Sequence, residues 1–223
     1  MTDDRARWEK RNAQAAPPPQ RRRAPVQERA KQQVNRILDA AAELIAEVGV
    51  DNATTNAIAA RVRISVGTLY QYFPNKEALV RALAVRYLEA LDAVLPVPLD
   101  ADPARWSLPE EVGRAIQVLE RFIKEHPGFP HVYRAARGAS DPESTQLLDH
   151  GKAHFEAIFA HRAPWVRPEE RRAHATVVVE AAHSLLVVAS MLESADHQQL
   201  IRELMIMLVR YLDPVYGDGM PAA

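Results

Sequence analysis

The chain has 223 residues, with 28 Lys and Arg against 29 Asp and Glu, 8 His and no Cys. The lack of Cys excludes disulfides, zinc–thiolate sites, iron–sulfur clusters and Cys nucleophiles, and 48% apolar with 26% charged residues is ordinary for a soluble globular protein. The acidic start is unlike a secretory signal, and the 12 uncharged residues between Glu180 and Glu193 are too few to cross a bilayer, so we expect a cytoplasmic protein without a membrane partner.

Charge is distributed unevenly along the chain. Residues 1–95 have 15 Lys and Arg and 11 Asp and Glu, whereas residues 96–223 have 13 and 18. Between residues 17 and 38 there are six basic side chains and a single acid, Glu28. Such a cluster is typical of a surface that binds polyanions, although a solvated tail has the same composition.

Residues 1–26 are predicted to form a disordered, basic and Pro-rich arm, because they are polar and interrupted by Pro17–Pro19 and Pro25. The arm ends near three consecutive basic residues, Arg21, Arg22 and Arg23. These could enter a minor groove, where narrow A·T tracts attract arginine. Non-specific attraction to phosphates, or solubility alone, would account for them equally.

A helix-turn-helix domain is predicted over residues 27–95. The first helix runs from about Gln27 along an apolar stripe at the helical period and ends at Gly49. The stripe consists of Val34, Ile37, Leu38, Ala41, Leu44, Ile45 and Val48. Three helices follow, capped by Thr54 or Thr55, by Ser65 and by Asn75, over about 55–63, 66–73 and 76–95.

The helix over 66–73 has an outer face suited to the major groove. In a helix-turn-helix the second helix of the pair places its N-terminal residues on base edges. Gly67 allows close backbone approach, Gln71 can read adenine, and the methyl group of Thr68 can touch thymine. Thr55 lies at a helix N-terminus and Lys76 opens the next helix, where each can contact a phosphate. Ordinary polar residues on a small helical bundle are the alternative.

The remaining residues, 96–223, are predicted to form a second, larger all-helical domain. Its helices are expected over about 110–125, 129–137, 142–162, 168–192 and 197–212, separated by Pro and Gly. The last two are apolar almost all round, so they need cover on both sides, which a two-fold dimer supplies. The predicted dimer interface comprises Val178, Leu185, Val188, Leu192, Ile201, Leu204 and Leu208. A monomer with these helices at its centre is the alternative.

The sequence of residues 54–79 resembles the DNA-binding signature of the TetR family of transcriptional regulators. The resemblance is most specific in Ser65-Val66-Gly67-Thr68-Leu69-Tyr70-Gln71-Tyr72-Phe73 and in Lys76-Glu77-Ala78-Leu79. It extends over about residues 34–83 and includes Ile37–Leu44 and Gly49. It implies phosphate contacts from Thr55, Tyr72 and Lys76. It further implies contacts with bases or nearby phosphates from Asn56, Thr68 and Gln71, and close approach to DNA by Val66, Gly67 and Tyr70.

Arg63 departs from the family pattern, which usually has Gly in this turn. A non-glycine residue in the left-handed conformation costs on the order of 1 kcal/mol. Either the turn differs slightly, or Arg63 tolerates the strain and adds a phosphate contact; we favour the second.

The resemblance also implies a small-molecule effector pocket in the second domain. Aromatic residues at helical spacing are the candidates for its lining: Phe122, Phe129, Tyr133, Phe155 and Phe159. The same spacing is typical of a simple core. His150 and His154 have a spacing that permits metal binding, but without a third ligand we expect exposed helix residues and no metal site.

The combined prediction is an all-α, ligand-responsive repressor that binds a palindromic DNA operator as a homodimer. No glycine-rich phosphate loop, G-x-S-x-G elbow or metal triad is present, so we expect neither an enzyme nor a bound cofactor. An architectural DNA-binding protein without an effector is the main alternative, and a ligand carrier that does not bind DNA is a further one.

Overall fold

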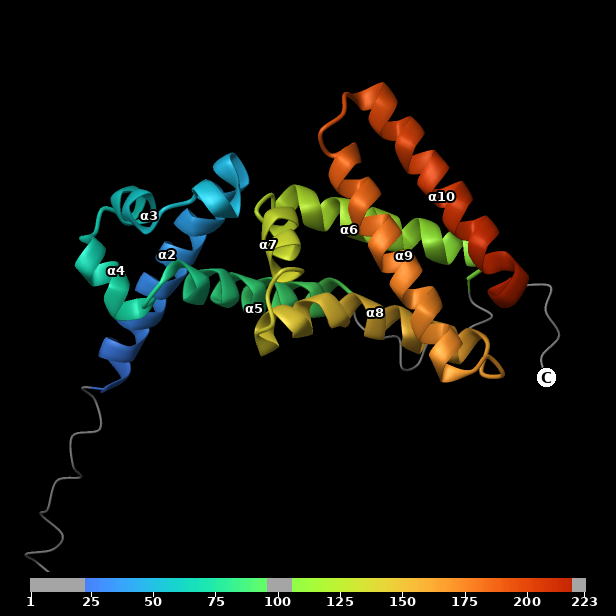
Figure 1. The fold of residues 1–223 in the computed structure, drawn as a ribbon, viewed down its shortest axis with the longest axis horizontal. Helices are drawn as coiled ribbons and strands as arrows, with labels where there is room; N and C mark the ends of the chain where they lie inside the picture. The colour runs from blue at the N-terminus through green and yellow to red at the C-terminus, as the bar shows by residue number, and fades with distance from the viewer. Residues whose placement is uncertain (1–22, 96–105, 218–223) are drawn as a thin grey trace, which may run out of the picture. The chain divides into compact units, whose positions relative to one another are not determined.

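The computed structural model describes residues 23–95 and 106–217, and these residues form helices without a β-strand (Figure 1). The predicted all-α fold is therefore confirmed. Contacts within the chain divide it into two units after Arg36. The predicted domain boundary near Pro96, like most of the N-terminal arm, lies outside the described residues.

The helix α2 spans Arg23–Asn52 and so begins four residues before the predicted start at Gln27. Gly49 interrupts it with φ 77° and ψ 167°, a conformation that glycine adopts without steric cost, and one further helical turn follows. The predicted stop at Gly49 is thus a kink. Most of the predicted apolar stripe after Arg36 is buried, with Ile37 and Ala41 fully inaccessible, but Val48 is 41% exposed.

Three helices follow α2 in the helix-turn-helix segment: α3 Thr55–Val62, α4 Val66–Tyr72 and α5 Lys76–Val94. Each begins where a side-chain oxygen accepts a hydrogen bond from a backbone N–H at the helix start. The three acceptors are Thr54, Ser65 and Asn75. Because such caps depend on neighbouring residues only, the helix starts could be predicted from sequence. The inner faces of α3, α4 and α5 bury Ile58, Leu69, Leu79 and Leu83 completely.

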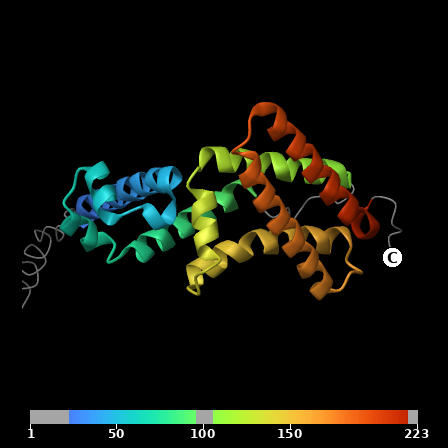
Figure 2. The ribbon, with the colours of Figure 1, turned by 45° about the horizontal axis from the view of Figure 1, so that its top comes forward.

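Five further helices follow: α6 Leu108–Glu125, α7 Phe129–Ala136, α8 Pro142–Arg162, α9 Pro168–Ala189 and α10 Ser194–Tyr216. All five were predicted, with ends that differ by up to four residues. α9 packs against both α8 and α10, while α5 packs against α8 (Figures 1 and 2). The long helix α5 thus starts in the helix-turn-helix and ends in the larger helical domain.

The turn between α6 and α7 packs directly against helices of the helix-turn-helix segment. A Cβ atom on Gly128 would lie 2.8 Å from the carbonyl oxygen of Ala42 in α2 and 2.8 Å from the Tyr87 hydroxyl in α5. Glycine is therefore required for this close approach. The Tyr87 ring also meets Phe129 edge-on, with centroids 5.6 Å apart.

By length and mean hydropathy, α9 passes the test for a membrane-spanning helix. It packs against α8 and α10. Within the chain, 33% of its most apolar 18-residue window is buried, so much of this apolar helix has no cover from the described residues.

Candidate nucleic-acid interface

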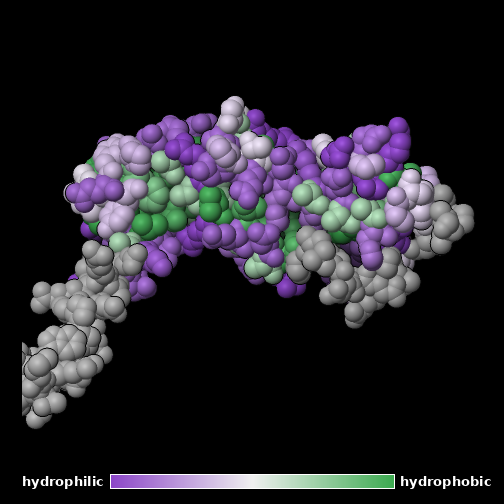
Figure 3. Space-filling view, turned by 90° about the horizontal axis from the view of Figure 1, so that it is seen from below, coloured by the Kyte–Doolittle hydropathy of each residue, from purple (hydrophilic) through white to green (hydrophobic). Residues whose placement is uncertain are grey.

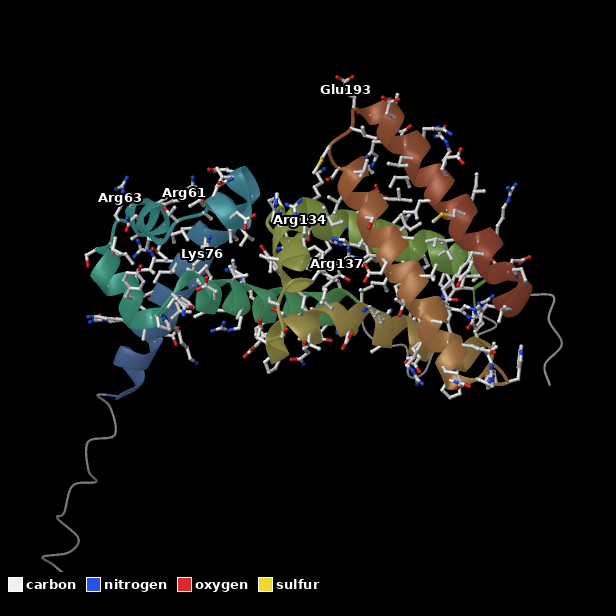
Figure 4. The ribbon with its side chains drawn as sticks, viewed as in Figure 1. Arg61, Arg63, Lys76, Arg134, Arg137 and Glu193 are labelled. Atoms are coloured by element: carbon white, nitrogen blue, oxygen red, sulfur yellow. The ribbon has the colours of Figure 1, made fainter. Side chains whose placement is uncertain are left out.

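The turn between α3 and α4 depends on a left-handed residue at Arg63, with φ 62° and ψ 47°. Its N–H donates to the Ala60 carbonyl at 3.1 Å, and the N–H of Ile64 donates to Ala59 at 3.0 Å. These bonds satisfy carbonyls at the end of α3 and turn the chain into α4. Among the described residues, no other non-glycine residue has a positive φ. Arg63 therefore tolerates the expected strain, on the order of 1 kcal/mol, and its side chain is exposed (Figure 4).

The outward face of α4 is polar and open. Gly67, Tyr70 and Gln71 are exposed, whereas Leu69 on the opposite side is fully buried. A Cβ atom on Gly67 would meet nothing nearer than the Ser65 hydroxyl at 3.7 Å, an ordinary contact. The fold itself therefore does not require glycine at this position. The missing side chain leaves this point of the face open to a partner that approaches from outside.

Hydrogen bonds hold the polar groups of this face in place. The Ser65 hydroxyl accepts from the Thr68 N–H at 3.0 Å and lies 2.8 Å from the Thr68 hydroxyl. The hydroxyls of Thr55 in α3 and Tyr70 in α4 are 3.2 Å apart. Groups from both helices thus meet on one surface before any ligand is bound. Such preorganisation lowers the entropy cost of binding.

Other predicted contact residues lie on the same segment. Asn56 and Arg63 are exposed, while Val66 and Tyr72 are half-buried at the two ends of α4. The side chains of Arg21, Arg22 and Arg23 lie outside the described residues, although Arg23 is the first residue of α2.

Lys76, the first residue of α5, caps the end of a different helix. Its ammonium donates to the carbonyl oxygens of Val50 at 3.1 Å and Asp51 at 3.0 Å, both in the last turn of α2. A cation is favourable there because the last carbonyls of a helix are unsatisfied and carry partial negative charge. Since an ammonium has three N–H groups, one remains for a phosphate oxygen.

Two ion pairs that the sequence did not reveal position the segment on α2. The guanidinium of Arg61 in α3 forms two hydrogen bonds with Glu47, at 2.9 and 2.6 Å, which lower the pKa of that carboxyl. Arg86 in α5 contacts Asp39 at 2.6 Å. Arg61 therefore binds α2 rather than adding to the cationic surface. No signal in the sequence distinguishes it from Arg63, which lies two residues away and has no ion pair among the described residues.

The predicted pocket aromatics are divided among three places in the larger domain. Phe155 and Phe159 line a cavity of about 250 Å³ between α6, α8 and α9. Phe129 and Tyr133, again with Phe155, line a smaller one of about 50 Å³. Phe122 is buried against the ring of Phe129, with centroids 5.0 Å apart. A third and larger cleft of about 1050 Å³ lies between α6, α7 and α9.

The structure corrects part of the predicted dimer interface. Val178, Leu204 and Leu208 are at most 3% exposed and belong to the core of the chain. Leu185 and Ile201 are half-buried, whereas Val188 and Leu192 are exposed. A nearly all-apolar helix carries no sequence signal for which side faces inward. The exposed apolar residues of this region also include Val177, Met191, Ile206, Met207 and Tyr211.

The expectation that His150 and His154 are exposed is wrong. His154 is 6% exposed, and burial lowers its pKa below the ordinary value. Its Nδ1 and the Nε2 of His150 are buried without a hydrogen-bond partner among the described residues. α8 buries this face because α5 and α9 pack on it. Among described residues, no cluster of three His, Asp or Glu side chains is placed to hold a metal.

Comparison with known proteins follows the same division of the chain. Residues 37–83 match the family model of bacterial regulatory proteins of the tetR family, and residues 107–212 match that of the tetracyclin repressor-like C-terminal domain. An uncharacterized HTH-type transcriptional regulator of Mycobacterium tuberculosis is 30% identical over 185 residues, covering 79% of this chain and 93% of that protein.

Two further similarities cover most of the chain. The HTH-type transcriptional repressor KstR of Rhodococcus jostii is 26% identical over 182 residues, covering 79% of this chain and 84% of its own length. The crystal structure of a TetR-family transcriptional regulator from Streptomyces coelicolor has a TM-score of 0.57 and 27% identity. It covers 82% of this chain and 99% of the Streptomyces chain.

Proposed function

This chain belongs to the TetR family of bacterial transcriptional regulators, and from that premise we propose that it represses transcription by binding a palindromic operator as a homodimer, in the cytoplasm, until a small-molecule effector releases it. The observation that carries the proposal is the open face of α4. At Gly67 this face has free space that the packing of the fold does not require, and DNA could occupy it. Family membership supplies DNA binding and regulation. The dimer, the palindrome and the effector are the parts proposed here.

The proposed contacts with DNA are of two kinds, those with base edges and those with phosphates. Gln71 and Thr68 on α4 are the candidates for base edges, because a glutamine amide can pair with adenine in a bidentate manner and a threonine methyl can touch thymine. Thr55, Arg63, Tyr72 and Lys76 are the candidates for phosphates. Asn56 is a candidate for a base or a nearby phosphate, and Val66, Gly67 and Tyr70 occupy positions that approach the DNA. Phosphate contacts fix the position of the protein and the base contacts supply the sequence preference.

The dimer is supported by the apolar side chains that α9 and α10 leave exposed. Val188 is 48% exposed, Met191 is 74% exposed and Met207 is 42% exposed. By contrast, the face of the molecule seen in Figure 3 is mostly hydrophilic, with hydrophobic residues in separate patches. Large apolar patches on soluble proteins mark interaction sites. A second copy that pairs α9 and α10 with its own would cover them as a four-helix bundle.

A two-fold dimer presents two copies of α4 in opposite orientations. Its operator is therefore an inverted repeat, whose half-sites are separated by about one helical turn of DNA or a multiple of it. The two recognition helices bind together only when their spacing matches that of the grooves. A change in the angle between the two copies of α5 would change this spacing.

The helix α5 supplies the route by which an effector acts. Its first residue, Lys76, holds α2, while Leu91 and Val94 near its other end line the internal cavities. An effector that binds better when α5 is displaced would shift the population toward a dimer with badly spaced recognition helices. Release of DNA then follows from the difference in affinity between the two states.

The test is selection of bound DNA from a random duplex pool, followed by sedimentation of the protein alone and with the selected duplex. We expect an inverted repeat to be enriched and two chains to bind each duplex. Equal binding of all sequences would contradict the proposal and support an architectural DNA-binding role. A protein that sediments as a monomer at micromolar concentration would contradict the dimer.

A further inference from the structure

A broad cleft between α6, α7 and α9 has a cationic wall. Its volume is about 1050 Å³, the size of a site for a small molecule of considerable length. Four basic side chains line it: Arg121 and Lys124 from α6, Arg134 from α7, and Arg137, the residue that follows α7. Figure 4 shows Arg134 on α7 and Arg137 at its end.

Little negative charge opposes these four cations. Arg137 forms an ion pair with Glu180. Glu120, the one carboxylate in the cleft lining, lies 2.8 Å from Nε2 of His197. The Ala189 carbonyl and Glu120 both raise the pKa of that histidine. No carboxylate in the described part of the chain pairs with Arg121, Lys124 or Arg134, so the cleft attracts anions.

The cleft leads toward an apolar interior. It shares Ile123, His183 and Leu186 with the cavity of about 50 Å³. That cavity in turn shares Leu95, Leu119 and Phe155 with the cavity of about 250 Å³. The three spaces are therefore neighbours that share walls, and their lining changes from largely cationic in the cleft to mostly apolar in the other two.

The interior has neutral polar groups that lack partners. The Tyr133 hydroxyl and Nδ1 of His154 are buried without a hydrogen-bond partner among described residues, and their side chains are 4% and 6% exposed. Burial and nearby Arg137 lower the pKa of His183 to about 4, so its imidazole is neutral at pH 7. A buried polar atom without a partner costs free energy, which a polar atom of a ligand would recover.

We propose that the effector of this regulator is an amphipathic anion. Its carboxylate or phosphate binds Arg121, Lys124 and Arg134 in the cleft, and its apolar chain passes His183 toward the cavity lined by Phe155. A further polar atom on the ligand's apolar chain forms a hydrogen bond with the Tyr133 hydroxyl or with Nδ1 of His154. The effect of this anion on DNA binding rests on the function proposed above, whereas its binding to the protein can be tested alone.

Other classes of ligand fit these surfaces poorly. A cationic drug would face four basic groups in the cleft and find no free carboxylate. A neutral hydrophobic molecule would fill the interior but leave the cations of the cleft unpaired. A hydrophilic anion such as a sugar phosphate would have no use for the apolar cavities, whose walls are formed mostly by Leu, Val, Ile and Phe side chains.

Anion binding at Arg134 has a direct connection to α2. The guanidinium of Arg134 donates to Nδ1 of His131 at 2.9 Å. The same Nδ1 lies 3.7 Å from the position of a Cβ atom on Gly49, at the kink of α2. A carboxylate that takes over the Arg134 donor frees His131 beside this kink. The anion would therefore act on the helix-turn-helix through α7.

The test compares four probes that differ in one property at a time: sodium decanoate, decan-1-ol, decyltrimethylammonium bromide and sodium hexanoate. Each is titrated into the full chain calorimetrically, below its aggregation concentration. We expect decanoate to bind about tenfold or more tightly than the alcohol, because a charge-assisted hydrogen bond contributes this much, and the ammonium compound not to bind. Hexanoate should bind more weakly, by about fourfold for each buried methylene it lacks.

The variants locate the head group. Arg121→Gln with Arg134→Gln should weaken decanoate binding by about tenfold or more and leave the alcohol unchanged. Arg167→Gln with Arg172→Gln, an equal change of charge at two exposed positions outside the cleft, should bind like the parent. Circular dichroism and thermal melts confirm that each variant is folded.

Each outcome bears on a different claim. Equal affinity for decanoate and decan-1-ol overturns the requirement for an anion, and unchanged decanoate affinity in the double variant overturns the assigned cleft. A protein that enriches an operator from random DNA but binds no decanoate overturns the effector class and leaves the proposed function standing. A protein that binds decanoate but enriches no DNA sequence overturns the proposed function instead.

Discussion

The ammonium of Lys76 lies 3.0 Å from the carbonyl oxygen of Asp51 and donates a hydrogen bond to it, which joins the start of α5 to the end of α2. The same residue is the candidate for a phosphate contact. One side chain therefore links the helix that reaches the internal cavities with the surface proposed to hold DNA. Any displacement of α5 changes the position of this cation.

Separate replacements of Lys76 and Gln71 distinguish phosphate contacts from base contacts. Lys76→Met should weaken binding to all DNA sequences and reduce the slope of log K against log salt by about 0.9, the value for one lost phosphate contact. It should also lower the free energy of unfolding by about 0.3–1 kcal/mol, since a helix loses its C-terminal cation. Gln71→Ala should leave the salt slope unchanged and relax the sequence preference at one base pair. Fluorescence anisotropy over a salt series measures both, and equal salt slopes for the two variants would contradict the assignment.

Gly67→Ala should affect stability and DNA binding in opposite directions. The new methyl group has space in the free protein, and alanine stabilises a helix interior by up to about 1 kcal/mol relative to glycine. DNA binding should become weaker because the methyl group occupies the proposed approach to the groove. Gly128→Ala is the control, because its methyl group would lie 2.8 Å from two oxygens and should destabilise the fold. Unchanged operator affinity in Gly67→Ala would show that DNA does not approach this position.

Arg63→Gly should relieve the strain of the left-handed turn. Glycine adopts φ 62° freely, so relief of the strain should raise the free energy of unfolding by about 1 kcal/mol. The larger conformational entropy that glycine gives the unfolded chain offsets part of this gain. If Arg63 contacts a phosphate, the salt slope falls by about 0.9. Urea denaturation and a salt series measure the two effects. A variant with the parent's salt slope would restrict Arg63 to a structural role.

Charge placed on the exposed apolar face should prevent dimerisation. Val188→Glu and Met191→Glu alter side chains that are 48% and 74% exposed, so the single chain loses little packing. In a dimer the carboxylates would be buried without partners, at a cost of several kcal/mol. Sedimentation velocity should show monomers, whereas Val85→Glu, on the exposed side of α5, should leave the dimer intact. A dimer that persists in both the Val188→Glu and the Met191→Glu variant places the interface elsewhere.

The stability of the larger domain should fall in mild acid. Burial depresses the pKa of His183 from 6.5 to about 4, so between these values the unfolded chain binds more protons than the folded one. The free energy of unfolding therefore decreases as the pH falls from about 6.5 to 4, by roughly 2–3 kcal/mol from this group. Urea melts at several pH values measure the slope. His183→Gln should flatten it, and His161→Gln, at an exposed position, should not.

Local signals accounted for most of what could be predicted. Ser65 and Asn75 cap the helices that they were predicted to cap, and Thr54 is the cap of the two threonines predicted for α3. The helical period identified the inner face of α2 after Arg36, apart from the exposed Val48. These features depend on residues a few positions apart, so the sequence alone contains them.

The sequence by itself determined the all-α fold, the limits of most helices and the residues of the helix-turn-helix. Only the tertiary structure decided which sides of α9 and α10 face inward, since their apolar residues surround the helix and carry no periodic signal. It also decided that His154 is buried, that Arg61 pairs with Glu47 and that four cations from α6 and α7 share one cleft. These depend on contacts between distant segments, and side-chain charge or hydropathy does not specify a partner until packing brings the helices together.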